Sequence, residues 1–457
     1  MKPNIEISAK LLSQGVLLQS AAAEELTISA ALWTFLQESE VQLINLMTGN
    51  PLPPDAPGNF EFSWVLYVFN NDVPGIITDA LRKLGMPASQ ITTAQWAGWE
   101  TTWSAQGVVY GDGTLVNTAP YAMLDPGWTI AFVDYILLHL GKIKTSPFGT
   151  TPATLDITGK PTLSVALFGD WGTGAYQDGN LPASPSQLIA QQLKNIAPDI
   201  SIHLGDVYYA GHPDEEQNNL VNCWPAGSLG NFALNSNHEM YYGAQGLFDT
   251  AYTSAALAGQ QHTSYFQVEF GNWLIVGLDT AYFDTSFLFM DGAITDGNQL
   301  AFLNKAAQSG KNIVLLTHHN PIDITGASIV GPPTNNLLSQ VTGALNSNPP
   351  KYWYWGHQHN GVVYTGESKG GKILCRCLGN AAIPIGNAAW LHNNPNVSFY
   401  TNKPLANPTT NQQLRVMNGF AVLEFTENDV TEKWYYEDGS SVNIVPETAK
   451  ESMAIGV

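Results

Sequence analysis

Five short polar clusters, each at the end of an apolar run, follow one another along the middle of this chain of 457 residues. They read GDWG, GDVYY, SNHE, THHNP and GHQH, at residues 169–172, 205–209, 236–239, 317–321 and 356–359. Together they supply aspartate, asparagine, tyrosine and histidine side chains, which are the ligand types of a site that holds two metal ions. The first candidate chemistry is therefore metal-assisted hydrolysis.

Paired aspartates are the part of this set that most needs a metal. Two carboxylates brought together at the edge of a sheet resist ionising together unless cations lie between them. A carboxylate that bridges two ions holds them roughly 3.5–4 Å apart, where a water or hydroxide is activated at neutral pH. Neutral imidazoles and an amide oxygen complete the metal shells without further negative charge. The pair of ions then keeps a positive field that suits a phosphate ester.

A repeating pattern of strand, loop and helix is expected to position these clusters. The segment 163–168 (LSVALF) predicts a buried strand, 186–197 a helix and 199–204 (DISIHL) the next strand, which together form a βαβ unit. Apolar runs that predict further strands are found at 273–278, 312–317, 351–355 and 420–425.

The clusters begin where predicted strands end. Asp170 and Asp206 each follow a strand by one glycine, His318 directly ends 312–317, and His357 follows 351–355 by one glycine. In open α/β sheets the carboxyl ends of the strands are where ligand sites gather, because the loops converge there on a rigid base. We therefore expect these four side chains to meet at one edge.

The chain changes character near residue 150. Apolar residues three and four apart predict amphipathic helices at 21–37, 75–85 and 129–141, and a hairpin turn is predicted within 108–116. The Pro-, Gly- and Thr-containing stretch 144–154 is typical of a linker. Two domains are therefore predicted, a mainly helical region at 1–150 and a catalytic domain at 151–457. The role of the first stays open between covering the pocket, self-association and scaffolding.

The order of the clusters resembles that of the calcineurin-like metallophosphoesterase superfamily. The motifs GDxG, GDxxY, NH followed by an acid, a strand-end histidine and GHxH occur in that order over about residues 160–390. GDVYY is similar to the purple acid phosphatase branch, and Gly172 stands where other relatives have a histidine. The resemblance implies an α/β (α+β) fold, a four-layer α/β/β/α sandwich of two mixed sheets flanked by helices.

The resemblance also implies roles for individual residues. Asp206 would bridge the two metals, and His238 would contact the phosphate or protonate the leaving oxygen as the catalytic residue. His318 is favoured over His319 as a ligand because it ends the strand, and His319 would then face the substrate. The ligands would be Asp170, Tyr209 and His359 for a first, ferric ion, and Asn237, His318 and His357 for a second ion, which would be zinc, manganese or ferrous iron.

Two positions depart from the family pattern. Ser236 precedes Asn237 where a glycine is usual, so the serine would have to adopt the backbone shape that the glycine supplies. Asn320 separates the histidine pair from Pro321 and blurs the choice between His318 and His319.

The function implied is an acid phosphatase-like phosphomonoesterase that uses a metal-activated hydroxide on a small phosphate ester. A phosphodiesterase of nucleotides or lipids on the same metal core is the first alternative, because the surrounding loops decide between mono- and diesters. The second alternative is a binding module whose catalysis has lapsed. Hydrolysis of esters and metal content distinguish the three.

Composition limits the partners. Lys and Arg total 18 against 38 Asp and Glu, with a net charge of −20, so duplex nucleic acid is not expected as a partner. Three cysteines are too few for a disulfide framework, and Cys375 and Cys377 are expected to pack in the core. We find no convincing secretory signal and no run of the roughly 18–20 apolar residues that a membrane span needs. A soluble, cytoplasmic protein is expected, with its oligomeric state open.

Overall fold

The structure is a computed structural model that describes residues 108–109, 115–116, 121, 128–139, 141–176, 183–329, 337–385, 388, 391–406 and 413–445. By its internal contacts the chain divides into two compact units, a first of Met1–Thr145 with Tyr241–Gly243 and a second of Ser146–Met240 with Ala244–Val457. The predicted helices at 21–37 and 75–85 lie outside the described residues. The predicted division of roles near residue 150 stays a prediction.

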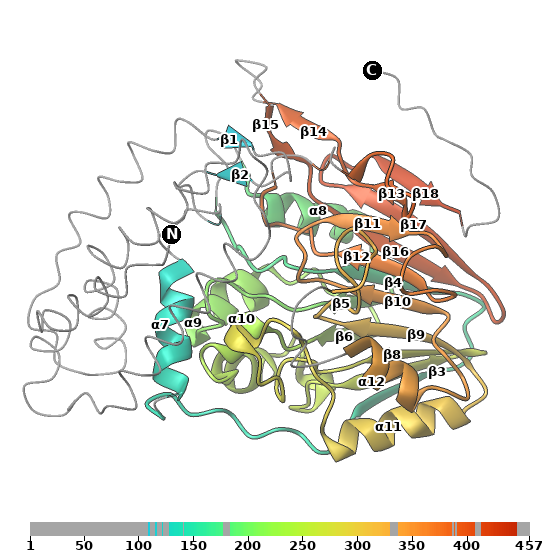
Figure 1. The fold of residues 1–457 in the computed structure, drawn as a ribbon, viewed down its shortest axis with the longest axis horizontal. Helices are drawn as coiled ribbons and strands as arrows, with labels where there is room; N and C mark the ends of the chain where they lie inside the picture. The colour runs from blue at the N-terminus through green and yellow to red at the C-terminus, as the bar shows by residue number, and fades with distance from the viewer. Residues whose placement is uncertain are drawn as a thin grey trace, which may run out of the picture. The chain divides into compact units, whose positions relative to one another are not determined.

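In the second unit, two large mixed sheets form the centre (Figure 1). The six-stranded sheet has the spatial order β18 (Ser441–Ile444), β17 (Val430–Tyr436), β16 (Gly419–Phe425), β4 (Leu163–Phe168), β5 (Ile200–His203) and β6 (Gly230–Ala233). The eight-stranded sheet has the order β13 (Val397–Tyr400), β11 (Gly361–Tyr364), β12 (Leu374–Leu378), β10 (Tyr352–Trp355), β9 (Asn312–Thr317), β8 (Trp273–Gly277), β7 (Phe266–Phe270) and β3 (Ala153–Ile157). A small separate ladder pairs β14 (Pro404–Ala406) with β15 (Gln413–Val416).

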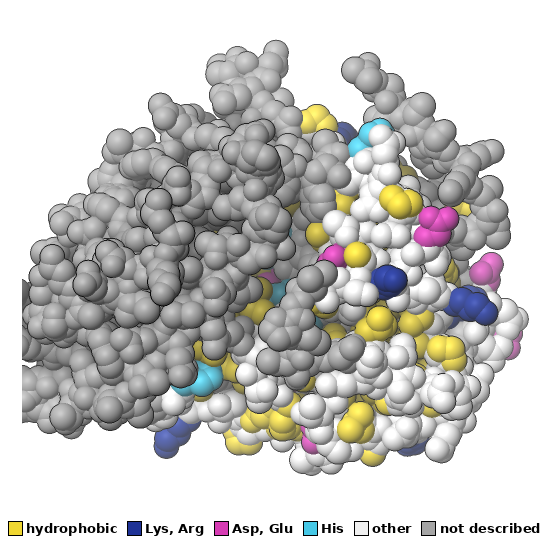
Figure 2. All heavy atoms as spheres, viewed as in Figure 1, with side chains coloured by type: hydrophobic (Ala, Val, Ile, Leu, Met, Phe, Trp, Pro, Cys, Tyr) yellow, Lys and Arg dark blue, Asp and Glu magenta, His cyan; other side chains and the backbone are white. Residues whose placement is uncertain are grey.

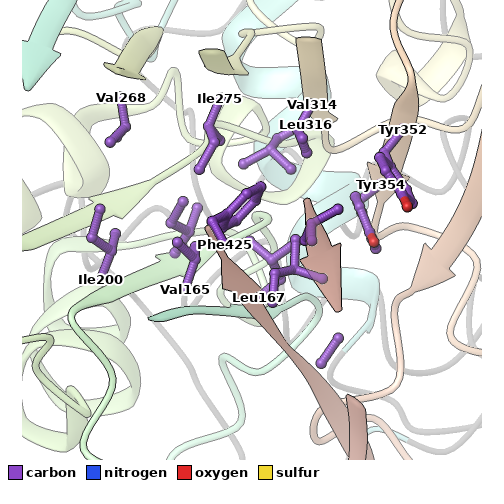
Figure 3. Packing of buried hydrophobic residues seen from close by; sticks show 14 of the residues in the cluster. Val165, Leu167, Ile200, Val268, Ile275, Val314, Leu316, Tyr352, Tyr354 and Phe425 are labelled. Carbon is purple, nitrogen blue, oxygen red and sulfur yellow. The ribbon is translucent and has the colours of Figure 1, made fainter. Parts of the chain in front are cut away.

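Side-chain alternation along the strands explains why the two sheets stack. Val314 and Leu316 of β9 face the six-stranded sheet, whereas Ile313 and Leu315 belong to a second cluster on the other face. Figure 3 shows Val165 and Phe425 of the six-stranded sheet in the cluster between the sheets. The second cluster includes buried residues of α11 (Gly297–Gln308) and α12 (Leu337–Ala344), so these helices cover the outer face.

The predicted βαβ unit is confirmed. β4 and β5 are parallel, and α8 (Pro185–Ile196) connects them. Ser184 caps this helix by accepting from the Gln187 N–H at 3.1 Å, and the Gln187 side chain accepts from the Ser184 N–H at 3.1 Å. The helix ends at Ala197, whose φ of 52° is left-handed. The predicted sandwich of two mixed sheets flanked by helices is thereby confirmed for this part of the chain.

Shorter helical elements lie in the loops that connect the strands of both sheets. The helices are α9 (Pro213–Glu215) and α10 (Asn237–Met240); π-helical segments span Glu216–Leu220 and Gly246–Ala251, and 3-10 turns span Val221–Cys223, Ala258–Gln260 and Phe287–Phe289. Outside the second unit, α7 (Trp128–His139) is described, and β1 (Val108–Val109) pairs antiparallel with β2 (Leu115–Val116), so the predicted hairpin is confirmed.

Surface charge, helix hydropathy and the buried cysteines complete the description of the fold. On the face drawn in Figure 2, acidic and basic side chains lie scattered and do not gather into one patch. Of the helices that the structure describes, none is long and apolar enough to cross a membrane. Cys375 and Cys377 are buried as free cysteines on β12, as expected.

Candidate metal centre

Loops from both large sheets converge on one site. Asp170, Asp206 and Asn237 follow β4, β5 and β6, while His318 and His357 follow β9 and β10. A hydrogen bond between His318 Nδ1 and the Leu204 carbonyl oxygen, 2.9 Å long, joins the two edges directly. The strand ends therefore lie close together as predicted, but they belong to two different sheets. Each sheet contributes residues of the types that bind metals.

His318 shows most clearly that a cation fits this site. Its Nδ1 donates to a carbonyl oxygen, which can only accept, so in the neutral imidazole Nε2 carries a lone pair. Burial lowers the pKa of His318 to about 3, which keeps the ring neutral at pH 7. Nε2 lies 2.9 Å from Asn237 Oδ1 and 3.1 Å from Asp206 Oδ1. Three electron-pair donors thus face one another, an arrangement that a cation relieves.

The two aspartates form a second grouping of acceptors. Asp170 is fully buried and Asp206 is 1% exposed. One phenol proton serves both, because the Tyr208 hydroxyl lies 3.1 Å from Asp170 Oδ1 and 2.9 Å from Asp206 Oδ2. Burial, followed by the charge of Asp206, raises the pKa of Asp170 well above its ordinary value. Without a cation, both carboxylates are therefore hard to ionise together.

The GHQH cluster completes the site. His357 donates its backbone N–H to Asp170 Oδ2 at 2.8 Å, and His359 Nε2 lies 3.4 Å from Asp170 Oδ1. Burial lowers the pKa of His359 to about 4 and that of His357 well below its ordinary value, so both imidazoles are neutral ligands at pH 7. Two groups have ligand atoms that all lie within 4.8 Å of one another: Asp170 with Asp206 and His318, and His318 with His319 and His357.

Four residues of the site have a strained backbone. Asp170, Asp206, His357 and His359 have φ values of 56°, 77°, 63° and 41°, in the left-handed region that non-glycine residues rarely adopt. Such conformations cost roughly 1–3 kcal/mol each and persist where the surrounding structure imposes them, often at functional sites. The fold therefore holds these four predicted ligands in conformations that their residue types disfavour.

His238 has one ring nitrogen committed and one directed at the aspartates. Nδ1 lies 2.6 Å from the Tyr209 carbonyl oxygen, to which it donates. Nε2 is 4.0 Å from Asp206 Oδ2, and the ring packs edge-on against Tyr208. The side chain is 11% exposed, so it keeps some access to solvent. This arrangement can present either a lone pair or a proton at Nε2.

Both nitrogens of His319 have partners in the protein. Nδ1 lies 2.8 Å from Thr280 Oγ1, and Nε2 lies 2.7 Å from the Phe289 carbonyl oxygen. Although His319 is close enough to His318 and His357 to share a metal with them, its hydrogen bonds would have to break first. We therefore favour His318 as the ligand, and the predicted substrate contact of His319 stays a prediction.

Sequence reasoning missed the tyrosine whose hydroxyl meets the two aspartates. That residue is Tyr208, which is fully buried, whereas the motif selects Tyr209. The backbone of Tyr209 donates its N–H to Glu215 Oε1 at 2.7 Å and accepts from His238 Nδ1 at its carbonyl oxygen. No periodic signal in the sequence points to Tyr208, because Asp206 has a left-handed φ of 77° and Tyr208 lies in the turn that follows β5.

Ser236 and Glu239 were also missed as neighbours of the site. The Ser236 hydroxyl hydrogen-bonds with Asp206 Oδ1 and with Glu239 Oε2. Burial, followed by the charge of Asp206, raises the pKa of Glu239 to about 8, so this acid is largely protonated at neutral pH. The backbone of Ser236 does not have a positive φ, so the serine meets no conformation that requires glycine. Ser236 therefore does not need the glycine-like backbone shape that the sequence analysis expected at this position.

Comparison with known proteins gives one family match, over part of the chain. The calcineurin-like phosphoesterase family profile matches residues 163–361. Among curated proteins no sequence matches this chain. Similar solved structures include purple acid phosphatase PPD1 from yellow lupin (16% identity, 65% of this chain and 54% of that chain covered, TM-score 0.40) and GAP50 of Plasmodium (13%, 64% and 91%, 0.41). A putative 5'-nucleotidase from Staphylococcus aureus is also similar (14%, 63% and 55%, 0.31).

Residues 163–361 of the chain therefore resemble the calcineurin-like phosphoesterase family. That family uses a dinuclear metal site and acts on phosphate esters, and the described part of this chain contains two groups of residues that could hold a metal ion. The chain spans about half the length of the lupin phosphatase, 54% of it.

Proposed function

We propose that this protein is a dinuclear phosphomonoesterase of the acid phosphatase kind, acting on small phosphate esters. The observation that carries the proposal is the set of electron-pair donors around His318 Nε2, which faces Asn237 Oδ1 at 2.9 Å and Asp206 Oδ1 at 3.1 Å. These side chains lie beside a second buried carboxylate, Asp170. A phosphate ester would approach the positive field of cations held there.

Asp206 is proposed to bridge the two metal ions. Asp170, His359 and one tyrosine would hold the first, proposed to be ferric iron, and Asn237, His318 and His357 the second, proposed to be zinc, manganese or ferrous iron. The motif selects Tyr209 as the tyrosine, whereas the hydroxyl contacts favour Tyr208. When bound, the two ions supply a Lewis acid for the phosphoryl group and a nucleophile at neutral pH.

His238 is proposed to act on the leaving group. The carbonyl oxygen of Tyr209 accepts from Nδ1 at 2.6 Å, which orients the ring with Nε2 toward Asp206. A protonated His238 would donate from Nε2 to the leaving oxygen and would also offset developing negative charge. Because Nε2 is 4.0 Å from Asp206 Oδ2, this proton lies next to the proposed metal bridge.

Metal analysis of the purified protein, together with a matched pair of esters, tests the proposal. We expect two metal ions per chain, rapid hydrolysis of 4-nitrophenyl phosphate and slow hydrolysis of bis(4-nitrophenyl) phosphate. Turnover of the diester alone would make the protein a phosphodiesterase. Protein without stoichiometric metal that hydrolyses neither ester would reject the enzyme and favour a binding module. An Asp206→Asn variant measures the background in each assay.

A further inference from the structure

Ser236 lies behind the aspartate that is proposed to bridge the metals. Its hydroxyl hydrogen-bonds with Asp206 Oδ1 and with Glu239 Oε2, and it accepts the backbone N–H of His238 at 3.0 Å. A single hydroxyl therefore contacts the side chain of one cluster and the backbone of another.

Glu239 closes this arrangement into a ring. While Oε2 contacts Ser236, Oε1 accepts the backbone N–H of Val207 at 3.1 Å. Val207 is the residue directly after Asp206, so the ring runs from the Asp206 side chain through Ser236 and Glu239 back to the Asp206 backbone. The loop that follows β5 and the loop that follows β6 are thereby fixed to each other.

The ring of hydrogen bonds is buried and restrains the Asp206 carboxylate. Asp206 is 1% exposed and Ser236 and Glu239 are fully buried, so water does not compete for these hydrogen bonds. Tyr208 binds Asp206 Oδ2 at 2.9 Å, while Ser236 binds Oδ1. With a partner at each oxygen, the carboxylate is held against rotation.

Two glycines provide the room for the ring. A Cβ at Gly205 would lie 2.9 Å from Ser236 Cβ, and a Cβ at Gly211 would lie 2.7 Å from Glu239 Cα. Both glycines have positive φ, 100° and 59°, which a side chain would also disfavour. The 205–211 loop is therefore shaped to admit Ser236 and Glu239.

We propose that Ser236 is a positioning residue that orients the Asp206 carboxylate for metal binding, with Glu239 as its buried support. The proposal rests on the proposed function, in which Asp206 bridges the two metals. Hydrogen-bond partners of metal ligands typically change metal affinity by about 10–100-fold when they are removed. Loss of the Ser236 hydroxyl is therefore expected to weaken binding of metal while the ligands themselves remain.

The test is titration of the metal-free protein with Mn²⁺, followed by calorimetry. We expect Ser236→Ala to bind Mn²⁺ roughly tenfold more weakly than the unmodified chain. The matched control is Ser201→Ala, because Ser201 is also a fully buried serine and donates to the Pro225 carbonyl oxygen at 2.6 Å, away from the metal ligands. Both variants should lower the melting temperature, but Ser201→Ala should leave the Mn²⁺ affinity within about twofold.

A second pair of variants covers the case in which Ser236→Ala does not fold. Ser236→Thr and Ser236→Val have nearly the same shape and differ in the hydroxyl, so Thr should bind Mn²⁺ roughly tenfold more tightly than Val. Equal affinities within this pair, or Ser236→Ala binding as tightly as the control, would overturn the positioning role. A wild-type chain that takes up no Mn²⁺, Zn²⁺ or iron would instead reject the proposed function and this role with it.

Discussion

Buried charge occurs in two different settings within the sandwich. Between the sheets, Arg376 of β12 pairs with Glu432 of β17, with 3.0 Å from Nε to Oε2, and Trp434 Nε1 donates to the other Glu432 oxygen at 2.7 Å. At the carboxyl edge, Asp170 and Asp206 are buried next to each other with a single phenol proton between them. The first setting joins opposite charges, and the second brings like charges together.

The difference separates a structural charge from a functional one. A buried arginine with a carboxylate partner is complete within the protein, although its desolvation offsets much of the attraction. Two buried carboxylates beside neutral histidines have like charge, and we propose that cations bind between them. The same contrast predicts opposite responses to mutation at the two places.

The largest effect is expected for Asp206→Asn. Removal of the bridging charge should abolish binding of two metals and lower kcat/KM by roughly a thousandfold. The metal-free variant should nevertheless melt no lower than the metal-free wild type, because one of two like charges has gone. Metal analysis, ester hydrolysis and thermal melting check both halves. Asp199→Asn, at a surface carboxylate paired with Lys160, is the control that should keep activity. If Asp206→Asn still binds two metal ions, Asp206 is not a functional charge of the kind contrasted with the Arg376–Glu432 pair.

Between the sheets the opposite result is expected. Arg376→Met leaves Glu432 as a buried carboxylate without its cation, which should reduce the free energy of unfolding by about 3–5 kcal/mol. Metal stoichiometry should stay unchanged. Chemical denaturation measures the loss, and Arg376→Met combined with Glu432→Gln should recover part of it because no unpaired charge remains. A loss below about 1 kcal/mol would show that this pair is not the structural charge we describe.

Substitution of the two tyrosines of GDVYY is expected to have a smaller effect, which concerns the colour of the iron-loaded protein. If Tyr208 supplies the oxygen for ferric iron, as its hydroxyl contacts favour, Tyr208→Phe should remove the charge-transfer colour of the iron-loaded protein. It should also weaken metal binding roughly tenfold. Tyr209→Phe is the matched control and should keep the colour. The visible spectrum of each iron-loaded variant gives the answer. Loss of colour in Tyr209→Phe, with the colour kept in Tyr208→Phe, would show that Tyr209 is the ligand, as the motif indicates.

The smallest effect concerns Glu216, a buried carboxylate whose two oxygens have no hydrogen-bond partner. Burial, followed by the charges of Glu239 and Glu215, raises its pKa well above the ordinary value. A raised folded pKa means that stability is greatest below the unfolded pKa and falls as pH rises above it. Glu216→Gln should therefore melt a few degrees higher than wild type at pH 8, with a smaller gain near pH 4. A gain independent of pH would exclude titration of Glu216 as its cause.

Much of the sandwich could be predicted because its strands are short apolar runs with clear ends. The run 312–317 is a strand with the predicted bounds, and 351–355 is found as Tyr352–Trp355. The strands at 266–270 and 230–233 were not predicted. Residues 266–270 (FQVEF) alternate apolar and polar side chains, a strand pattern that a search for continuous apolar runs does not detect, whereas residues 230–233 (GNFA) are too short and too polar to give either signal. The division of the strands between two sheets was predicted only from the family resemblance. An apolar run predicts that a strand is present but not which strand pairs with it.

The candidate site could be predicted as far as strand ends determine it. Asp170, Asp206, His318 and His357 meet as expected, because each follows a strand directly. Tyr208, Ser236 and Glu239 were not found, since their contacts depend on how the 205–211 and 236–239 loops fold against each other. Loop geometry of this kind has no periodic signal in the sequence.

Uptake of metal by the metal-free protein tests the central claim, that like-charged donors at the carboxyl edge form a site for two cations. Titration with Mn²⁺ or Zn²⁺, with thermal melting at each point, measures stoichiometry and stability together. We predict saturation at two ions per chain and a melting temperature that rises with metal concentration, because ligands that bind the folded state stabilise it. Less than one ion per chain, with an unchanged melting temperature, would contradict the claim.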